Sequence, residues 1–148
     1  MGRSMRRMAR VLLADSQPLF NEALESLLSR DRAHQVVGCC PSAEQAFMVA
    51  SRLNPDLILV DDALGLDGSP SLIKRILQSR PDVKVVVLGD DHDPDLMAAA
   101  IRSGPAGALG KTHGASTVLR VTQAVMAGEA AMPRTYVAHT GPGHGHTG

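Results

Sequence analysis

The sequence contains only two cysteines, and they are adjacent to each other. Cys39 and Cys40 are the whole cysteine content of the 148 residues. Side chains of neighbouring strand residues point to opposite faces, so this pair is poorly placed to form a disulfide or to share a metal ion. The chain lacks the disulfide scaffold of a small secreted protein, and we expect a reduced, cytoplasmic protein.

Long apolar runs are also missing. The apolar runs are only a few residues long, whereas a transmembrane helix needs about 20 predominantly apolar residues. The N-terminus is basic, but Leu12 and Leu13 are closely followed by Asp15, which leaves no apolar region of a signal peptide. We therefore expect no membrane partner.

Aromatic residues and net charge are scarce as well. Tryptophan is absent and only Phe20, Phe47 and Tyr136 are aromatic, so the core must be built from aliphatic side chains. The formal net charge is zero, which gives no global argument for a nucleic-acid or membrane partner. One basic cluster lies at the N-terminus and consists of Arg3, Arg6, Arg7 and Arg10. We interpret it as a solvated leader, with contact to phosphate or lipid as the alternative.

Short runs of branched apolar residues recur along the chain and indicate buried strands. Apolar residues at consecutive positions are typical of a parallel sheet that is covered on both faces. Four such runs are at residues 11–14, 36–39, 57–60 and 85–88, with a weaker one at 107–109.

Five stripes with helical spacing lie between and after these runs. They cover Leu19–Leu28, Ala43–Ala50, Leu72–Leu77, Leu96–Ile101 and Val118–Met126. Ser42 and Gln45 form a capping-box pattern before the second helix, and Asp93 with Pro94 begins the fourth. Strands that alternate with helices predict a parallel α/β sandwich.

The pattern suggests a domain flanked by two less ordered segments. We expect a basic leader over 1–8 and the globular domain over 9–132. Residues 133–148 form a low-complexity segment without a regular apolar pattern, which predicts a disordered tail or the start of a linker. His144 and His146 in this tail leave a stray metal site as an alternative.

Polar residues follow the first, third, fourth and fifth predicted strands, where ligands bind in open parallel sheets. They are Asp15, Ser16, Asp61, Asp62, Asp90, Asp91 and Lys111, with Gly89 directly after the fourth strand. Neighbouring carboxylates repel each other unless a cation lies between them, and magnesium suits such an oxygen cluster. Lys111 could hold a phosphoryl group as a point charge, or the set could be a simple Asp–Lys salt bridge.

Four segments of the sequence resemble, in the same order, segments of the receiver domains of NarL/FixJ-type (LuxR-type) response regulators. The resemblance rests on VLLADSQPLF at 11–20, PDLILVD at 55–61, PDVKVVVL at 81–88 and GPAGALGK at 104–111. It extends over roughly residues 9–132 in consistent order. It implies a flavodoxin-like, CheY-like (βα)5 three-layer sandwich with the strand order 2-1-3-4-5.

The resemblance also implies roles for individual residues. Asp61 would be the phosphoacceptor and Lys111 the lysine that contacts the phosphoryl group. Asp15, Asp61 and the backbone carbonyl of Ala63 would form a magnesium site. We expect any magnesium to bind weakly here, for the reasons that follow.

Several pocket positions depart from the family pattern. Ser16 replaces a second acid, Gly89 replaces the threonine or serine that ends the fourth strand, and Ala108 replaces an aromatic residue. The loop from Asp62 to Gly68 is one residue short and lacks its usual proline. A phosphoryl group adds about −1.5 to −2 charges and needs donors or a cation. These changes predict an atypical pocket in which Lys111 compensates Asp15 and Asp61.

We therefore expect a regulatory receiver rather than an enzyme. It would act through dimer or partner contacts, with a sensor histidine kinase as a possible partner and homodimerisation through its helices. DNA would be contacted only through a C-terminal helix-turn-helix absent from this chain, and a piece of a longer protein is favoured over a stand-alone receiver. Conventional Mg²⁺-dependent phosphorylation of Asp61 remains one alternative, and small-molecule binding at the strand ends, where Gly89 and Ala108 leave extra room, remains a second.

A different class is an enzyme or nucleotide-binding protein on the same architecture, because fold does not dictate function. No nucleophile–base pair stands out, and no glycine-rich phosphate loop follows the first strand. A flavoprotein would be yellow when purified, so colourless protein without phosphoesterase activity would exclude the main forms of this class.

Overall fold

Five parallel strands form one sheet at the centre of the computed structural model, which describes residues 8–90, 92–129 and 131. The strands are β1 (Ala9–Ala14), β2 (His34–Cys40), β3 (Leu57–Asp61), β4 (Lys84–Gly89) and β5 (Gly107–Gly110). They lie in the order β2-β1-β3-β4-β5, which confirms the order implied by the resemblance. The central strands β3 and β4 are composed mainly of branched apolar residues, as expected for a sheet covered on both faces.

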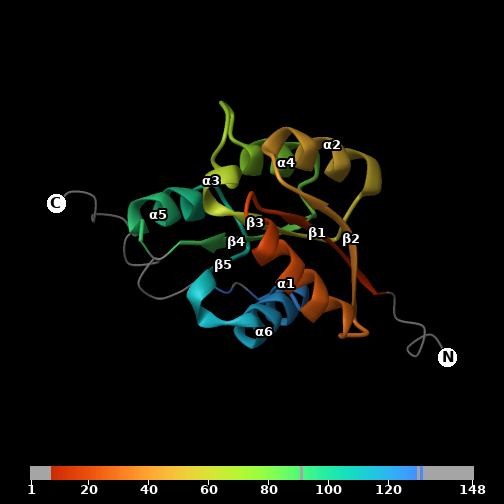
Figure 1. Cartoon of the computed structure of the whole chain (residues 1–148). Helices are drawn as coiled ribbons and strands as arrows, with labels where there is room; N and C mark the ends of the chain where they lie inside the picture. Colours follow the sequence, from red (N-terminus) through yellow and green to blue (C-terminus); the bar gives the residue numbers. More distant parts are fainter. Residues whose placement is uncertain (1–7, 91, 130, 132–148) are drawn as a thin grey trace.

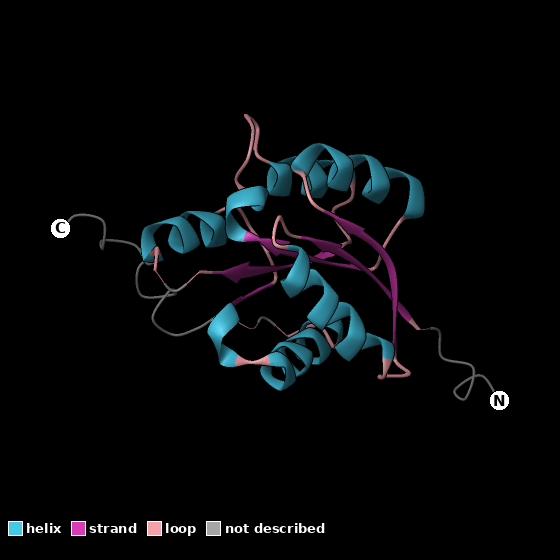
Figure 2. Cartoon of the chain, in the orientation of Figure 1, coloured by secondary structure: helices cyan, strands magenta, loops and turns pink. Residues whose placement is uncertain are grey.

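Helices cover both faces of this sheet, giving three layers (Figures 1 and 2). One face carries α1 (Pro18–Ser29) and α6 (Ala115–Met126). The other carries α2 (Ala43–Leu53), α3 (Asp62–Gly65), α4 (Leu72–Ser79) and α5 (Pro94–Arg102). Neither the short helix α3 nor the 3-10 turn η2 (Lys111–His113) was predicted, because neither is long enough to show a helical repeat of apolar residues.

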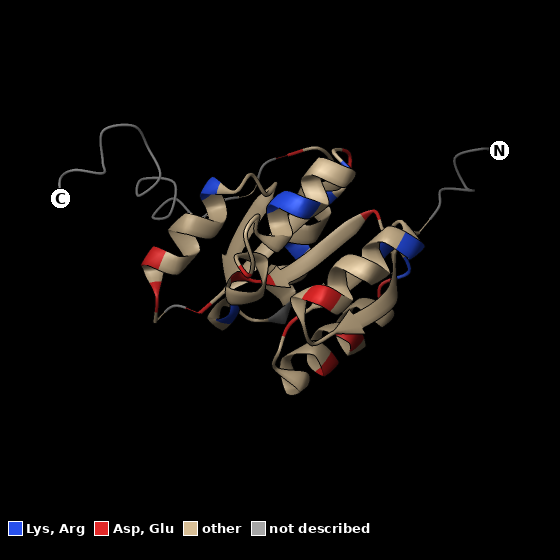
Figure 3. Ribbon diagram, turned by 90° about the horizontal axis from the view of Figure 1, so that it is seen from above, with Lys and Arg blue, Asp and Glu red and all other residues tan. Residues whose placement is uncertain are grey.

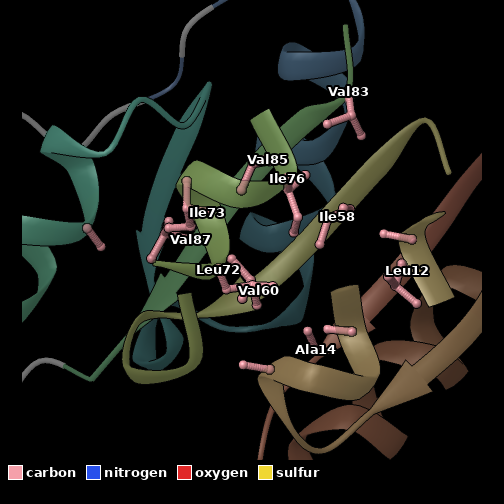
Figure 4. Packing of buried hydrophobic residues seen from close by; sticks show 14 of the residues in the cluster. Leu12, Ala14, Ile58, Val60, Leu72, Ile73, Ile76, Val83, Val85 and Val87 are labelled. Carbon is pink, nitrogen blue, oxygen red and sulfur yellow. The ribbon is translucent and has the colours of Figure 1, made fainter. Parts of the chain in front are cut away.

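The hydrophobic core is aliphatic, as the scarcity of aromatic residues predicted. Leu12, Ile58 and Val85 are almost fully buried and pack under α2 and α4 (Figure 4). A second layer of buried valines and leucines lies between the sheet and the pair α1 and α6. Phe20 and Phe47 are only partly buried and lie at the margins of these two layers.

The expected helix starts are present. Ser42 Oγ accepts a hydrogen bond from the backbone N–H of Gln45 (3.3 Å), and Asp93 Oδ1 accepts one from Leu96 (3.0 Å). Both bonds satisfy N–H groups that have no partner inside the helix. Cys39 is exposed and Cys40 is buried, and both are free, as expected for neighbours on a strand.

Arg10 belongs to the folded domain and not to a solvated leader. It lies in β1, where its guanidinium donates to the carbonyl oxygens of Leu53 and Asn54, and its backbone N–H donates to Asp56 Oδ2 (2.8 Å). These bonds tie β1 to the turn between α2 and β3. The remainder of the predicted leader over 1–7 and the tail 133–148, with His144 and His146, lie outside the described residues. Within the described part, no helix is long and apolar enough to cross a membrane.

Candidate functional site

The carboxyl ends of the strands bring together three charged residues that are far apart in the sequence. Asp15 follows β1, Asp61 ends β3 and Lys111 follows β5. Because parallel strands end at the same edge of a sheet, these side chains meet there. Lys111 Nζ lies 2.7 Å from Asp15 Oδ2 and 3.1 Å from Asp61 Oδ1. One ammonium group therefore bridges the two carboxylates.

Lys111 is held by further contacts on the α1 side. Its ammonium donates a hydrogen bond to Gln17 Oε1 (2.8 Å) and lies 4.6 Å from the centre of the Phe20 ring. Burial alone would lower the pKa of Lys111, but its hydrogen bonds and attraction to Asp15 and Asp61 outweigh this, so the pKa is raised. Lys111 is therefore a firmly protonated cation at neutral pH. Sequence reasoning did not identify Gln17, because its role depends on a contact across 94 positions.

The two bridged carboxylates are also fixed by the backbone. Asp15 Oδ1 accepts a hydrogen bond from Gln17 N–H (2.8 Å), and Asn21 Nδ2 donates to the Asp15 carbonyl oxygen (2.9 Å). Asp61 Oδ2 accepts from Leu64 N–H (3.4 Å) and caps the short helix α3. Each carboxylate thus has one oxygen directed to the backbone and the other to Lys111.

Asp62 is a third acid at this edge, and it is buried. Its Oδ1 accepts from Ala63 N–H (2.7 Å) and its Oδ2 from Asp90 N–H (3.3 Å). Burial, followed by repulsion from Asp61, raises the pKa of Asp62, although the two backbone hydrogen bonds and Lys111 oppose the change. Asp62 therefore carries its charge at an energetic cost.

Gly89, at the end of β4, lies against a side chain that sequence reasoning did not associate with the site. A methyl group placed on Gly89 would overlap Met97 Cε and lie 3.0 Å from Asp62 Oδ2. Met97, from α5, is fully buried. The space expected to be vacant beside Gly89 is consequently filled by the thioether of Met97.

Ala108 lies in a different environment from the other pocket residues. It is buried in the core, pairs with Val87 of β4, and is not among the residues that line the strand-end cleft. The absence of a larger side chain at position 108 therefore adds no room to that cleft. The extra space expected from Gly89 and Ala108 together is not found.

A cleft of about 510 Å³ remains open above the strand ends. Among the predicted residues it is lined by Ser16, Asp61, Asp62, Ala63, Gly89, Asp90 and Lys111. Gln17, His92, Asp93, Leu96 and Thr112 also line it and were not predicted as pocket residues. Part of this wall is the start of α5, which has Asp95 in its first turn and Arg102 in its last (Figure 3). The cleft is predominantly acidic, because its lining includes Asp61, Asp62, Asp90 and Asp93 against the single cation Lys111.

The carboxylate oxygens that were expected to bind magnesium already have other contacts. Magnesium requires oxygen ligands in near-octahedral geometry. The inner oxygens of Asp15 and Asp61 already contact Lys111, and Ser16 supplies a neutral hydroxyl where a second acid would add charge. Among the described residues, no group of three or more histidine, cysteine, aspartate or glutamate side chains is placed to hold a metal ion.

Comparison with known proteins agrees with this arrangement of strands. Residues 11–123 match the family described as the response regulator receiver domain, so the chain belongs to that family. It is 30% identical over 126 residues to the transcriptional regulatory protein LnrK of Bacillus subtilis, a match that covers 85% of this chain and 57% of that protein. It is 29% identical over 122 residues to the response regulator GacA of Pseudomonas viridiflava, with 82% and 57% covered. The chain thus spans a little over half the length of these relatives.

Solved structures show the same fold. A LuxR-family two-component response regulator from Aurantimonas superposes with a TM-score of 0.77 at 20% identity, covering 90% of this chain and 96% of that one. The receiver domain of NarL from Mycobacterium tuberculosis gives a TM-score of 0.74 at 22% identity, covering 84% of this chain and all of that one.

Proposed function

We propose that this chain is the input domain of a two-component transcriptional regulator of the NarL/FixJ (LuxR-type) group, and that it works without conventional phosphorylation of Asp61. The first part is supported by the similarity to LnrK and GacA, whose names describe a transcriptional regulatory protein and a response regulator. In this proposal residues 9–132 are the receiver, and a DNA-binding output region would lie outside this chain.

The observation that carries the second part is the double ion pair of Lys111. Its ammonium lies 2.7 Å from Asp15 Oδ2 and 3.1 Å from Asp61 Oδ1 and compensates both carboxylates. A phosphoryl group on Asp61 would add about −1.5 to −2 further charges, and Lys111, which already serves Asp15 and Asp61, is the only lysine or arginine among the described residues that line the cleft. Ser16 supplies no negative charge to recruit a second cation. In the unphosphorylated domain, Lys111 therefore already serves as the counter-ion of Asp15 and Asp61.

The Gly89 side of the cleft supports the same reading. A hydroxyl at this position could donate a hydrogen bond to a phosphoryl oxygen, but glycine has none. Met97 fills the adjacent space and Asp62 Oδ2 adds negative charge there. Since like charges repel in a partly buried site, a phosphoryl group on Asp61 would meet a carboxylate where it needs a donor.

In this proposal the domain regulates its output through contacts made by its surface, and not through transient phosphorylation of Asp61. It homodimerises through its helices and holds an attached output region in a fixed arrangement, or shifts it when a partner binds one state better. A sensor histidine kinase is then a binding partner at most, and the protein works in the cytoplasm. Small-molecule binding in the cleft has less support than the sequence suggested, because Met97 fills the space beside Gly89.

The test is intact-mass spectrometry of the purified chain after incubation with Mg²⁺ and acetyl phosphate. We expect the mass to remain unchanged, with a conventional receiver treated in parallel showing the gain of one phosphoryl group. A stoichiometric mass gain that disappears in Asp61→Asn would refute the proposal and establish conventional phosphorylation.

A further inference from the structure

The site contains one residue that contacts both ends of the central ion pair, and nothing in the family resemblance assigns it a role. Gln17 precedes α1 and is one of the residues that line the cleft. We propose that Gln17 is a positioning residue that holds the Lys111 ammonium against Asp15 and Asp61, and so determines whether the cleft admits a phosphate-like anion. This inference rests on the proposed role of Lys111 as an internal counter-ion.

The first argument is geometric. The backbone N–H of Gln17 donates to Asp15 Oδ1 (2.8 Å), while its side-chain Oε1 accepts from Lys111 Nζ (2.8 Å). Lys111 in turn lies 2.7 Å from Asp15 Oδ2. The three residues therefore form a closed ring that joins the end of β1 to the residue after β5.

The second argument is that the start of α1 fixes the position of Gln17. Its carbonyl oxygen accepts hydrogen bonds from Phe20 N–H (3.1 Å) and Asn21 N–H (3.2 Å), and Pro18 follows it at the first helical position. A proline at this position has a backbone angle that already suits the helix. The Gln17 side chain is therefore attached to a rigid helix end, although it lies at the surface of the cleft.

The third argument concerns the number of donors. A lysine ammonium has three N–H donors, and three oxygens surround it here, from Asp15, Asp61 and Gln17. The face of Phe20 occupies a further side at 4.6 Å. An incoming anion must displace one of the oxygens, and the neutral amide is the weakest of the three because charge-assisted hydrogen bonds are stronger. An incoming anion therefore displaces Gln17 Oε1, and not a carboxylate oxygen, from the Lys111 ammonium.

The experiment follows the Lys111 ammonium itself, by ¹⁵N-resolved NMR of lysine side chains in the full chain without Mg²⁺ or a phosphoryl donor. We expect Gln17→Ala to accelerate exchange of the Lys111 ammonium protons with water by about fivefold, because one hydrogen bond is lost. Gln17→Glu should restore slow exchange, because its carboxylate can accept the same bond. Gln123→Ala, which removes a surface glutamine that bonds to Asp31, is the matched control and should leave Lys111 unchanged.

A second measurement tests access to the cleft with inorganic phosphate as the probe. We expect a saturable shift of the Lys111 resonance in Gln17→Ala and none in the unaltered chain at the same concentrations. Unchanged proton exchange in Gln17→Ala, an equal acceleration in Gln123→Ala, or no phosphate response in Gln17→Ala would each overturn the inference. Because the exchange measurement uses no phosphoryl donor, its outcome is independent of whether Asp61 can be phosphorylated.

Discussion

The thioether of Met97 lies where any side chain on Gly89 would lie. A methyl group on Gly89 would overlap Met97 Cε and lie 3.1 Å from Met97 Sδ. The end of β4 and the helix α5 therefore pack more closely than a larger residue at position 89 would allow. This packing, together with the ion pairs of Lys111, defines the strand-end edge of the domain.

Introducing a side chain at position 89 is expected to be costly. Gly89→Thr should lower the free energy of unfolding by about 1 to 2 kcal/mol, within the usual range for overpacking and moderated because methionine can change its rotamer. Urea unfolding followed by circular dichroism measures the change.

Met97→Ala provides the control for that substitution. Alone it should destabilise the protein by roughly 2 kcal/mol or more, because it leaves a cavity in the core. Combined with Gly89→Thr it should cost less than the sum of the two single changes, since the residues share one space. Strict additivity would show that Met97 does not occupy the volume beside Gly89.

Removing the Lys111 charge should destabilise the domain strongly. Lys111→Met leaves Asp15 and Asp61, which are 3% and 8% exposed, as neighbouring unpaired carboxylates. We expect a loss of roughly 2 to 3 kcal/mol in unfolding free energy at pH 7, below the value for a fully buried pair because the cleft is open to water. Lys74→Met, on an exposed part of α4, should have little effect, and equal stability of the two variants would contradict the assignment.

The pH dependence of this effect follows from the raised pKa of Lys111. A lysine whose folded-state pKa is raised stabilises the native state fully below its unfolded pKa, and loses that contribution as the pH rises through the folded value. The stability difference between the unaltered chain and Lys111→Met should therefore be constant around neutral pH and shrink under strongly alkaline conditions. Denaturant midpoints across an alkaline pH series measure it.

The ionised carboxylate of Asp62, unlike the ammonium of Lys111, should lower the stability of the folded domain at neutral pH. Its pKa is raised in the folded state, so the native protein binds more protons than the unfolded chain, and stability falls as the pH rises from the unfolded value through the folded one. Asp62→Asn removes this titration. The stability of Asp62→Asn relative to the unaltered chain should thus improve as the pH rises from acidic towards neutral, and a constant difference across this range would be inconsistent with a raised pKa.

Adding an acid next to Asp15 should give the site an affinity for magnesium. Ser16→Asp supplies the negative charge that the cleft lacks beside Asp15, and we expect Mg²⁺ to bind at least about tenfold more tightly. Backbone NMR shifts near Ala63 during a Mg²⁺ titration report the binding. Ser26→Asp, which adds the same charge at an exposed position further along α1, should leave the affinity unchanged.

The local sequence determined the order of strands and helices. Consecutive branched residues such as those of β3 and β4 identify strands buried on both faces, and Ser42 and Asp93 mark helix starts through hydrogen bonds that span three residues. The dependence on a local pattern also explains why the short helix α3 was not predicted. The short helix α3 has no apolar repeat of its own, and it begins where Asp61 caps it.

The tertiary structure decided what surrounds each charge. The sequence by itself identified Asp15, Asp61 and Lys111 as residues at one sheet edge, because the ends of parallel strands meet there. It could not specify that Gln17 completes the shell of Lys111 or that Met97 fills the space beside Gly89, since both contacts join elements that only folding brings together. The direction of a side chain and the packing of a helix against a strand depend on the whole domain. Strand and helix patterns, in contrast, depend on a few consecutive residues.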